Sequence, residues 1–117
     1  MKRNESSEQQ ALIVWCELNR NKYRGLDLLF AIPNGGSRHK LEAFRLKKEG
    51  VKAGVPDLFL PVSKKGYNGL FIEMKYGRNK LTEKQKEWII NLNLQGYKTA
   101  VCYGMEEAIT VLKEYYS

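Results

Sequence analysis

The chain has 117 residues and a mass of 13.6 kDa, and 43% of its residues are hydrophobic, which suits one compact domain over residues 1–117. Its 20 Lys and Arg residues outnumber 13 Asp and Glu residues, giving a formal charge of +7 and a pI near 9.4, so an anionic partner such as nucleic acid is favoured. No apolar run suits a signal segment or a membrane helix, and we expect a cytoplasmic protein without a membrane partner.

The first predicted elements are a helix and a short strand. Ser6 is a candidate N-cap, with Gln9 three positions on in capping-box spacing, and apolar periodicity carries the helix to about Asn21. Residues 28–32 then have the apolar composition of a short buried strand.

A turn and a second helix follow. Residues 33–36, Pro-Asn-Gly-Gly, are strong turn formers. Residues 38–49 predict a helix with Gly50 at its C-terminal cap, and its expected inward side chains are Leu41 and Phe44, with Leu46 as a further candidate.

The second half of the chain predicts three strands and two helices. Strands over 57–60 and 69–75 form a hairpin, a helix from Thr82 to Leu94 is closed by Gly96, and a strand over 98–103 precedes a helix over 105–115. The predicted fold class is therefore α/β, a mixed sheet flanked by helices in the order αβαββαβα.

Several residues are interpreted as core residues. Cys16 and Cys102 lie in apolar runs outside any CxxC pattern, which indicates buried free thiols in a reducing compartment. Four aromatic residues at apolar-periodic positions are interpreted as packing residues more than base-stacking platforms: Trp15, Phe30, Phe44 and Trp88.

Two stretches hold the positive charge. Residues 38–54 contain six Lys or Arg residues against two Glu, and residues 75–86 contain five against one. Surface lysines that only maintain solubility are the alternative explanation. Clustering beside candidate metal-binding carboxylates favours a phosphate-binding surface instead.

Three residues between the basic stretches match the needs of metal-dependent phosphodiester hydrolysis. Such chemistry requires hard oxygen ligands, a group that positions water, and positive charge facing the phosphate. Strand alternation puts Glu73 and Lys75 on one face, roughly 6–7 Å apart, and the hairpin brings Asp57 beside Glu73. Two converging carboxylates repel each other unless a cation such as Mg²⁺ or Mn²⁺ lies between them.

A structural explanation competes with this one. Glu73 and Lys75 would then be an ordinary exposed pair, and Asp57 a turn residue. However, the apolar run over residues 70–72 leads directly into Glu73, and lone charges in a buried strand are costly.

Three segments carry a resemblance to a known family. Gly54-Val55-Pro56-Asp57-Leu58, then Gly69 to Lys75 (GLFIEMK), then Leu81 to Trp88 (LTEKQKEW) resemble the virus-type replication-repair nuclease family, VRR-NUC, in its stand-alone form. This family is a branch of the PD-(D/E)xK nucleases, so the resemblance implies a restriction-endonuclease-like core.

The resemblance also implies site roles. Asp57 and Glu73 would ligate the metal with the Met74 backbone carbonyl, and Lys75 would be the catalytic lysine. Glu8 resembles the family's additional acidic residue, while Glu5 competes for that role.

The positions of Glu8 and Gln85 also have explanations that need no active site. Glu8 also suits the first turn of a helix, where a carboxylate complements the helix dipole. Gln85 resembles the glutamine that lies beside the lysine in the family, although capping opposite Thr82 explains its position nearly as well.

The expected DNA surface surrounds this site, and catalytic use of the single histidine, His39, has little support. The DNA-binding candidates are Asn34, Gly35, Gly36, Ser37, Arg38, Lys40, Lys52, Arg78 and Lys80.

The expected function is a Mg²⁺- or Mn²⁺-dependent endonuclease acting on branched DNA such as four-way junctions, as a homodimer without a small-molecule cofactor, in a bacterial or phage-infected cell. Two alternatives stay open. One is a non-catalytic nucleic-acid-binding module, and the other is a sequence-specific restriction-type endonuclease of the same superfamily.

Overall fold

The computed structural model describes residues 3–33 and 39–117, and along them the predicted order αβαββαβα is confirmed, with one 3-10 helix before the first strand. The helices are α1 (Glu5–Leu18), α2 (Lys40–Lys48), α3 (Glu83–Leu94) and α4 (Met105–Tyr116), and the 3-10 helix is η1 (Leu26–Leu28). The strands are β1 (Phe30–Ala31), β2 (Leu58–Leu60), β3 (Leu70–Lys75) and β4 (Lys98–Tyr103).

The four strands form a mixed sheet in the order β1-β2-β3-β4. β2 and β3 are the predicted antiparallel hairpin, with Leu58 opposite Ile72, and β4 runs parallel to β3. Every residue of β3 is buried because this central strand is covered on both faces.

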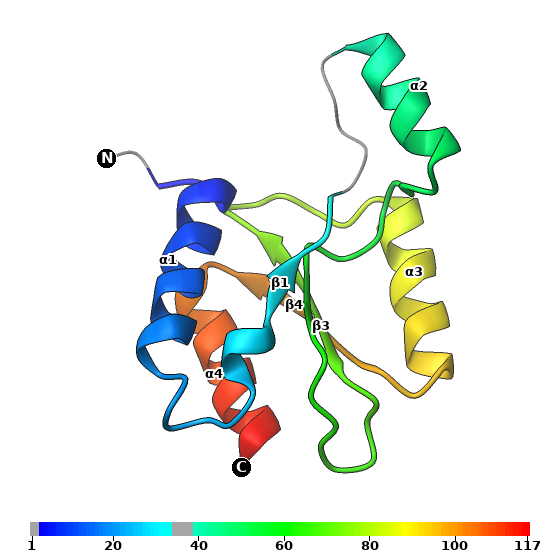
Figure 1. The fold of residues 1–117 in the computed structure, drawn as a ribbon. Coiled ribbons are helices and arrows are strands. Elements are labelled where there is room, and N and C mark those ends of the chain that lie inside the picture. Colours follow the sequence, from blue (N-terminus) through cyan, green and yellow to red (C-terminus); the bar gives the residue numbers. More distant parts are fainter. Residues whose placement is uncertain (1–2, 34–38) are drawn as a thin grey trace.

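Helices cover both faces of the sheet. Figure 1 shows α1 and α4 together on one face and α3 on the other. Alternate residues of β2 and β3 point to the α1 and α4 side, where they form the apolar core with Leu12 and Leu112. These strand residues are Leu58, Leu60, Leu70, Ile72 and Met74. The intervening residues of the same strands therefore face α3.

The first helix begins earlier than predicted. Asn4, not Ser6, is the N-cap: its side chain accepts a hydrogen bond from the Ser7 backbone N–H, and the Ser7 hydroxyl accepts one from Asn4 N–H. Asn and Ser are similarly good N-cap residues, so the sequence was compatible with a cap at either position, and the helix begins after the earlier one. The helix ends at Leu18 instead of near Asn21.

The segment predicted as a buried strand over 28–32 is mostly not strand. Leu28 closes η1, and only Phe30 and Ala31 pair with β2. Phe30 is 49% exposed because it lies on the edge strand of the sheet.

The predicted inward face of the second helix is wrong. Leu41 is 86% exposed and Phe44 is 59% exposed, and no residue of α2 is buried. Figure 1 shows α2 standing out from the body of the domain, so it has no sheet face to cover. The predicted turn before it, residues 34–36, lies outside the described residues.

The remaining element signals are confirmed. Thr82 caps α3 in a capping box with Gln85, and Gly50 and Gly96 follow α2 and α3 with positive φ. Cys16 and Cys102 are buried free thiols. In the described part of the chain, no helix combines the length and apolarity that crossing a bilayer requires.

Candidate active site

Asp57 lies immediately before β2, at the end of the sheet where β3 finishes. The antiparallel register, extended by one residue from Leu58 and Ile72, places Asp57 across from Glu73. Its Oδ2 accepts a hydrogen bond from the Met74 backbone N–H at 2.8 Å. The side chain thus completes the sheet's hydrogen bonding at the point where β2 has ended, which fixes the carboxylate beside β3.

Glu73 and Lys75 are two residues apart on β3 and share the face towards α3. Both are buried, at 3% and 7% exposed, and the Lys75 Nζ lies 3.8 Å from Glu73 Oε2. Gln85 of α3 donates from Nε2 to the same Oε2 at 3.2 Å. The other oxygen, Glu73 Oε1, is buried and has no hydrogen-bond partner in the described part of the chain.

Gln85 helps to cap α3, as its position predicts, and it also contacts Glu73 of the candidate site. Its Oε1 accepts from the Thr82 backbone N–H at 2.9 Å and closes the capping box, while its Nε2 reaches Glu73. The cap therefore holds the amide in the orientation that presents a donor to the site.

The two carboxylates disturb each other's ionisation. Burial, and then the neighbouring charge of Asp57, raise the pKa of Glu73 to about 8. Burial also raises the pKa of Asp57, opposed by the hydrogen bond from Met74 N–H. A proton shared by the pair therefore resides on Glu73 when no cation is present.

The two acidic residues of the first turn of α1 have different surroundings. Glu8 is buried, paired with Arg3 at 2.9 Å and bonded by the Met105 backbone N–H at 3.0 Å, and these contacts lower its pKa. Its carboxylate joins α1 to the start of α4, and its charge is not among those that shift the pKa of Asp57 or of Glu73.

Glu5 is the acidic residue of α1 that acts on the pair. Its charge contributes to raising the pKa of both Asp57 and Glu73. Its Oε2 accepts a hydrogen bond from Asn79 Nδ2 at 2.8 Å, from the segment after β3. The geometry favours Glu5 over Glu8 as a third carboxylate, and the Asn79 contact had no signal in the sequence.

The chemistry of these groups fits a divalent cation. Within residues 3–33 and 39–117, no third Asp, Glu, His or Cys completes a metal-ligating cluster with Asp57 and Glu73. Even so, two neighbouring carboxylates whose pKa values are both raised by burial, with one unpartnered buried oxygen among the described residues, are a set that a hard cation would satisfy.

The expected DNA-binding residues are only partly placed. Lys40, Lys52, Arg78 and Lys80 are exposed, the last two on the segment that leads from β3 towards α3. Residues 34–38, which include Asn34, Gly35, Gly36, Ser37 and Arg38, lie outside the described residues. Their DNA-binding role stays a prediction.

A mixed sheet between helices, with two carboxylates and a lysine at one end, defines the chain as a nuclease-type DNA-processing domain. The model of the VRR-NUC domain matches residues 3–106, so the chain belongs to the VRR-NUC domain family, as the motifs predicted. Nucleases of this kind typically use divalent metals.

A solved structure supports the same assignment. It is described as a VRR_NUC domain protein and superposes with a TM-score of 0.81 at 31% identity, covering 98% of this chain and 89% of the other. Comparison with curated proteins gives no match.

Proposed function

We propose that the protein is a Mg²⁺- or Mn²⁺-dependent endonuclease that hydrolyses phosphodiester bonds in branched DNA, with four-way junctions as its substrate. One observation carries the proposal. Among the described residues, the buried Glu73 Oε1 has no hydrogen-bond partner, while the same carboxyl group has Lys75 Nζ at 3.8 Å from Oε2 and a pKa raised by burial and by the charge of Asp57. Such an arrangement is costly for a fold and useful for metal-dependent hydrolysis.

The carboxylates are assigned to cation binding. Asp57 and Glu73 would hold the ion with the Met74 carbonyl, and Glu5 would face it from α1 in place of Glu8. When bound, the cation supplies Lewis-acid polarisation of the phosphate and a lower pKa for water. Asn79 keeps Glu5 directed to this side, and Gln85 keeps Glu73 oriented through its Nε2.

Lys75 is assigned to the reacting groups. Its side chain is buried beside Glu73, so the position of the ammonium group is restricted. From there it would orient the attacking water and oppose the charge that develops on the phosphate.

Branched DNA is the substrate we infer, and a homodimer is the active form. Apart from α2, the described helices all lie against the sheet (Figure 1), so little of the described chain is left to read base sequence. Two symmetric subunits would present two sites to two equivalent strands of a junction. The exposed basic residues near β3 and α3 suit a sequence-independent grip on phosphates.

The test uses labelled four-way junction, flap and linear duplex DNA, with and without Mn²⁺ or Mg²⁺. We expect metal-dependent cutting of the junction, and Asp57→Asn and Lys75→Met should each reduce the rate by about 100-fold or more while binding in chelator persists. Lys98→Met, at an exposed lysine of β4, is the matched control and should cut normally.

Other outcomes identify other functions. Cutting that survives both substitutions would remove these residues from the active site. Binding without cutting under any metal would indicate a nucleic-acid-binding module, and cutting of linear duplex at one defined sequence would indicate a restriction-type enzyme.

A further inference from the structure

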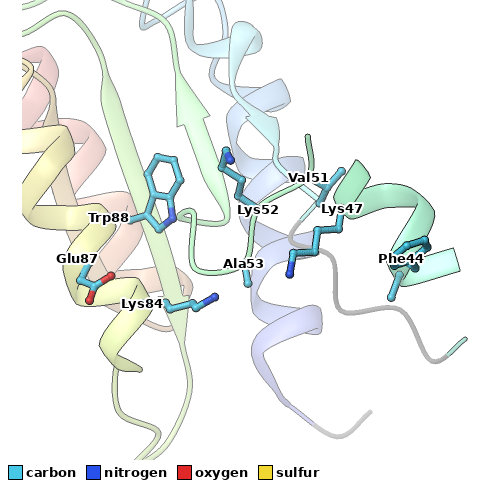
Figure 2. Close-up of a pocket in the computed structure, with 9 residues that line it drawn as sticks. Phe44, Lys47, Val51, Lys52, Ala53, Lys84, Glu87 and Trp88 are labelled. Carbon is cyan, nitrogen blue, oxygen red and sulfur yellow. The ribbon is translucent and has the colours of Figure 1, made fainter. Parts of the chain in front are cut away.

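A groove of about 590 Å³ opens between α2 and α3, and one of its walls is the helix that also carries Gln85. The loop over residues 51–53 forms its floor, and Figure 2 shows side chains from all three segments around it. The residues that matter here are Phe44 and Lys47 of α2, Lys52 of the loop, and Lys84, Glu87 and Trp88 of α3.

The groove combines positive charge with aromatic rings. The groove is lined by three lysines and one glutamate, Glu87, so the net charge of its lining is positive. In Figure 2 the ammonium groups of Lys47 and Lys84 extend from opposite sides towards the space between the two helices. Positive charge beside aromatic rings is the composition of grooves that hold single-stranded nucleic acid, where phosphates meet lysines and bases stack on rings.

Trp88 has side-chain surface that is not used in packing. It is half-buried, and besides the groove it borders a second hollow of about 340 Å³ with Ile32, Pro33 and Val55. A ring that borders open space in two directions keeps surface available for a base.

The groove shares its walls with the active site. Gln85, which bonds to Glu73, directly follows Lys84, and Trp88 lies three residues further, about 4.5 Å along the helix axis. On the other wall, the loop passes through Gly54 against Lys84 and reaches Asp57. DNA that enters this groove would therefore continue to the carboxylates.

We propose that the groove receives an unpaired segment of the DNA strand next to the scissile phosphate, with Trp88 stacking on a base and Lys47, Lys52 and Lys84 meeting phosphates. The proposal rests on the nuclease function proposed above and narrows its substrate class to branched DNA with unpaired nucleotides. The volume lies in the range of about 300–1,000 Å³ typical of pockets for small ligands, which is room for one or two nucleotides inside the groove. A symmetric contact with a second copy through this groove would bring two surfaces of net positive charge together.

The chain carries two tryptophans, which provides a direct optical test. In a Trp15→Phe variant, Trp88 is the sole tryptophan, and with excitation selective for tryptophan over the seven tyrosines a short oligothymidylate should quench it in chelator as bases stack. In the matched Trp88→Phe variant, Trp15 of α1 emits, and quenching should be absent. Anisotropy of the labelled oligonucleotide confirms in both cases that DNA is bound.

Substitutions give an independent measurement. Trp88→Leu should weaken binding of a junction with unpaired thymines at the branch by about tenfold, and that of a fully paired duplex much less. Trp88→Phe should keep most of the affinity because a ring remains. Replacing Lys52 and Lys84 by Ala should reduce the salt dependence of log affinity by about 1.4, whereas replacing Lys98 and Lys113 should leave it unchanged.

The outcomes separate the groove from the nuclease. If the protein cuts junctions but Trp88 emission does not respond to bound DNA, and Trp88→Leu binds like the parent, the groove proposal fails while the proposed function stands. If no DNA is cut with any metal, the proposed function fails. Emission of Trp88 that changes with protein concentration without DNA would assign the groove to a second copy and overturn the proposal.

Discussion

Among the described residues, Glu73 has an unusual environment for a carboxyl group. It lies 3% exposed in a strand whose six residues are all buried, and burial and Asp57 together raise its pKa. When no cation is bound, a proton on Glu73 removes the cost of burying its negative charge beside Asp57. The stability of the folded protein in chelator should therefore depend on pH.

The sign of the dependence follows from the raised pKa. An unfolded chain releases the Glu73 proton near the ordinary glutamate pKa of 4.5, while the folded protein keeps it until about pH 8, so the free energy of unfolding falls as pH rises across this window. We expect Glu73→Gln to lack this fall in the free energy of unfolding. At pH 8 the variant should be more stable than the parent protein by on the order of 2 kcal/mol.

Denaturant unfolding in chelator at several pH values across the window measures this effect. Glu17→Gln, at an exposed position of α1, is the control and should follow the parent protein. Equal pH dependence in parent and Glu73→Gln would show that Glu73 ionises in the folded state as in the unfolded one.

At the scale of elements, the loop that carries Asp57 is held against α3 by a glycine. Gly54 has φ +92, and a Cβ there would lie 2.8 Å from Lys84 Cβ and 2.9 Å from the Lys84 carbonyl carbon. Only glycine permits both the left-handed backbone and this approach. The contact therefore sets the distance between the Asp57 loop and the helix that carries Gln85.

Gly54→Ala should move the loop away from α3. We expect a loss of stability of on the order of 2 kcal/mol, together with a cleavage rate reduced by more than about tenfold, because Asp57 moves relative to Glu73. Gly50→Ala is the matched control: its φ is +102 but no atom lies within 4 Å of the added Cβ.

The Gly50→Ala control should lose only about 1 kcal/mol of stability and should cut DNA at the parental rate. Thermal unfolding and junction cleavage measure both effects. Similar losses in the two variants would mean that backbone strain alone, and not the contact with Lys84, accounts for the glycine.

At the scale of the whole molecule, three separate segments converge at one end of the sheet. The first turn of α1 supplies Glu5, the ends of β2 and β3 supply Asp57, Glu73 and Lys75, and the first turn of α3 supplies Gln85. Figure 1 shows this end of β3 flanked by the beginnings of α1 and α3. Elsewhere, large apolar side chains remain exposed, and Leu94 at the end of α3 is 76% exposed.

We predict a homodimer in solution, with a mass by light scattering of twice 13.6 kDa, because exposed apolar surface favours association. Leu94→Lys and Val14→Lys place a charge on α3 and α1 respectively. The variant that yields monomers and separates the two cuts in a cruciform plasmid identifies the interface. A monomer at concentrations that support paired cutting would refute the dimer.

The sequence by itself determined much of this protein. Apolar alternation, the Thr82 and Gln85 capping box and the glycines after α2 and α3 are local signals, so the order of elements and the fold class could be predicted from them. The motifs from Gly54 to Trp88 were enough to identify the family, which the family model confirms. Asp57, Glu73 and Lys75 were nominated on one face because strand alternation is also a local rule.

Only the tertiary structure decided what depends on neighbours that are distant in the chain. Glu5 and Glu8 lie on the same helical turn, and their different partners, Asn79 for Glu5 and Arg3 with the start of α4 for Glu8, are set by the tertiary structure. The periodicity of α2 resembled that of a covering helix, yet the sheet faces are covered by other helices, so Phe44 stayed exposed. Side-chain partners and uncovered surfaces are set by packing across the whole fold, which no local pattern encodes.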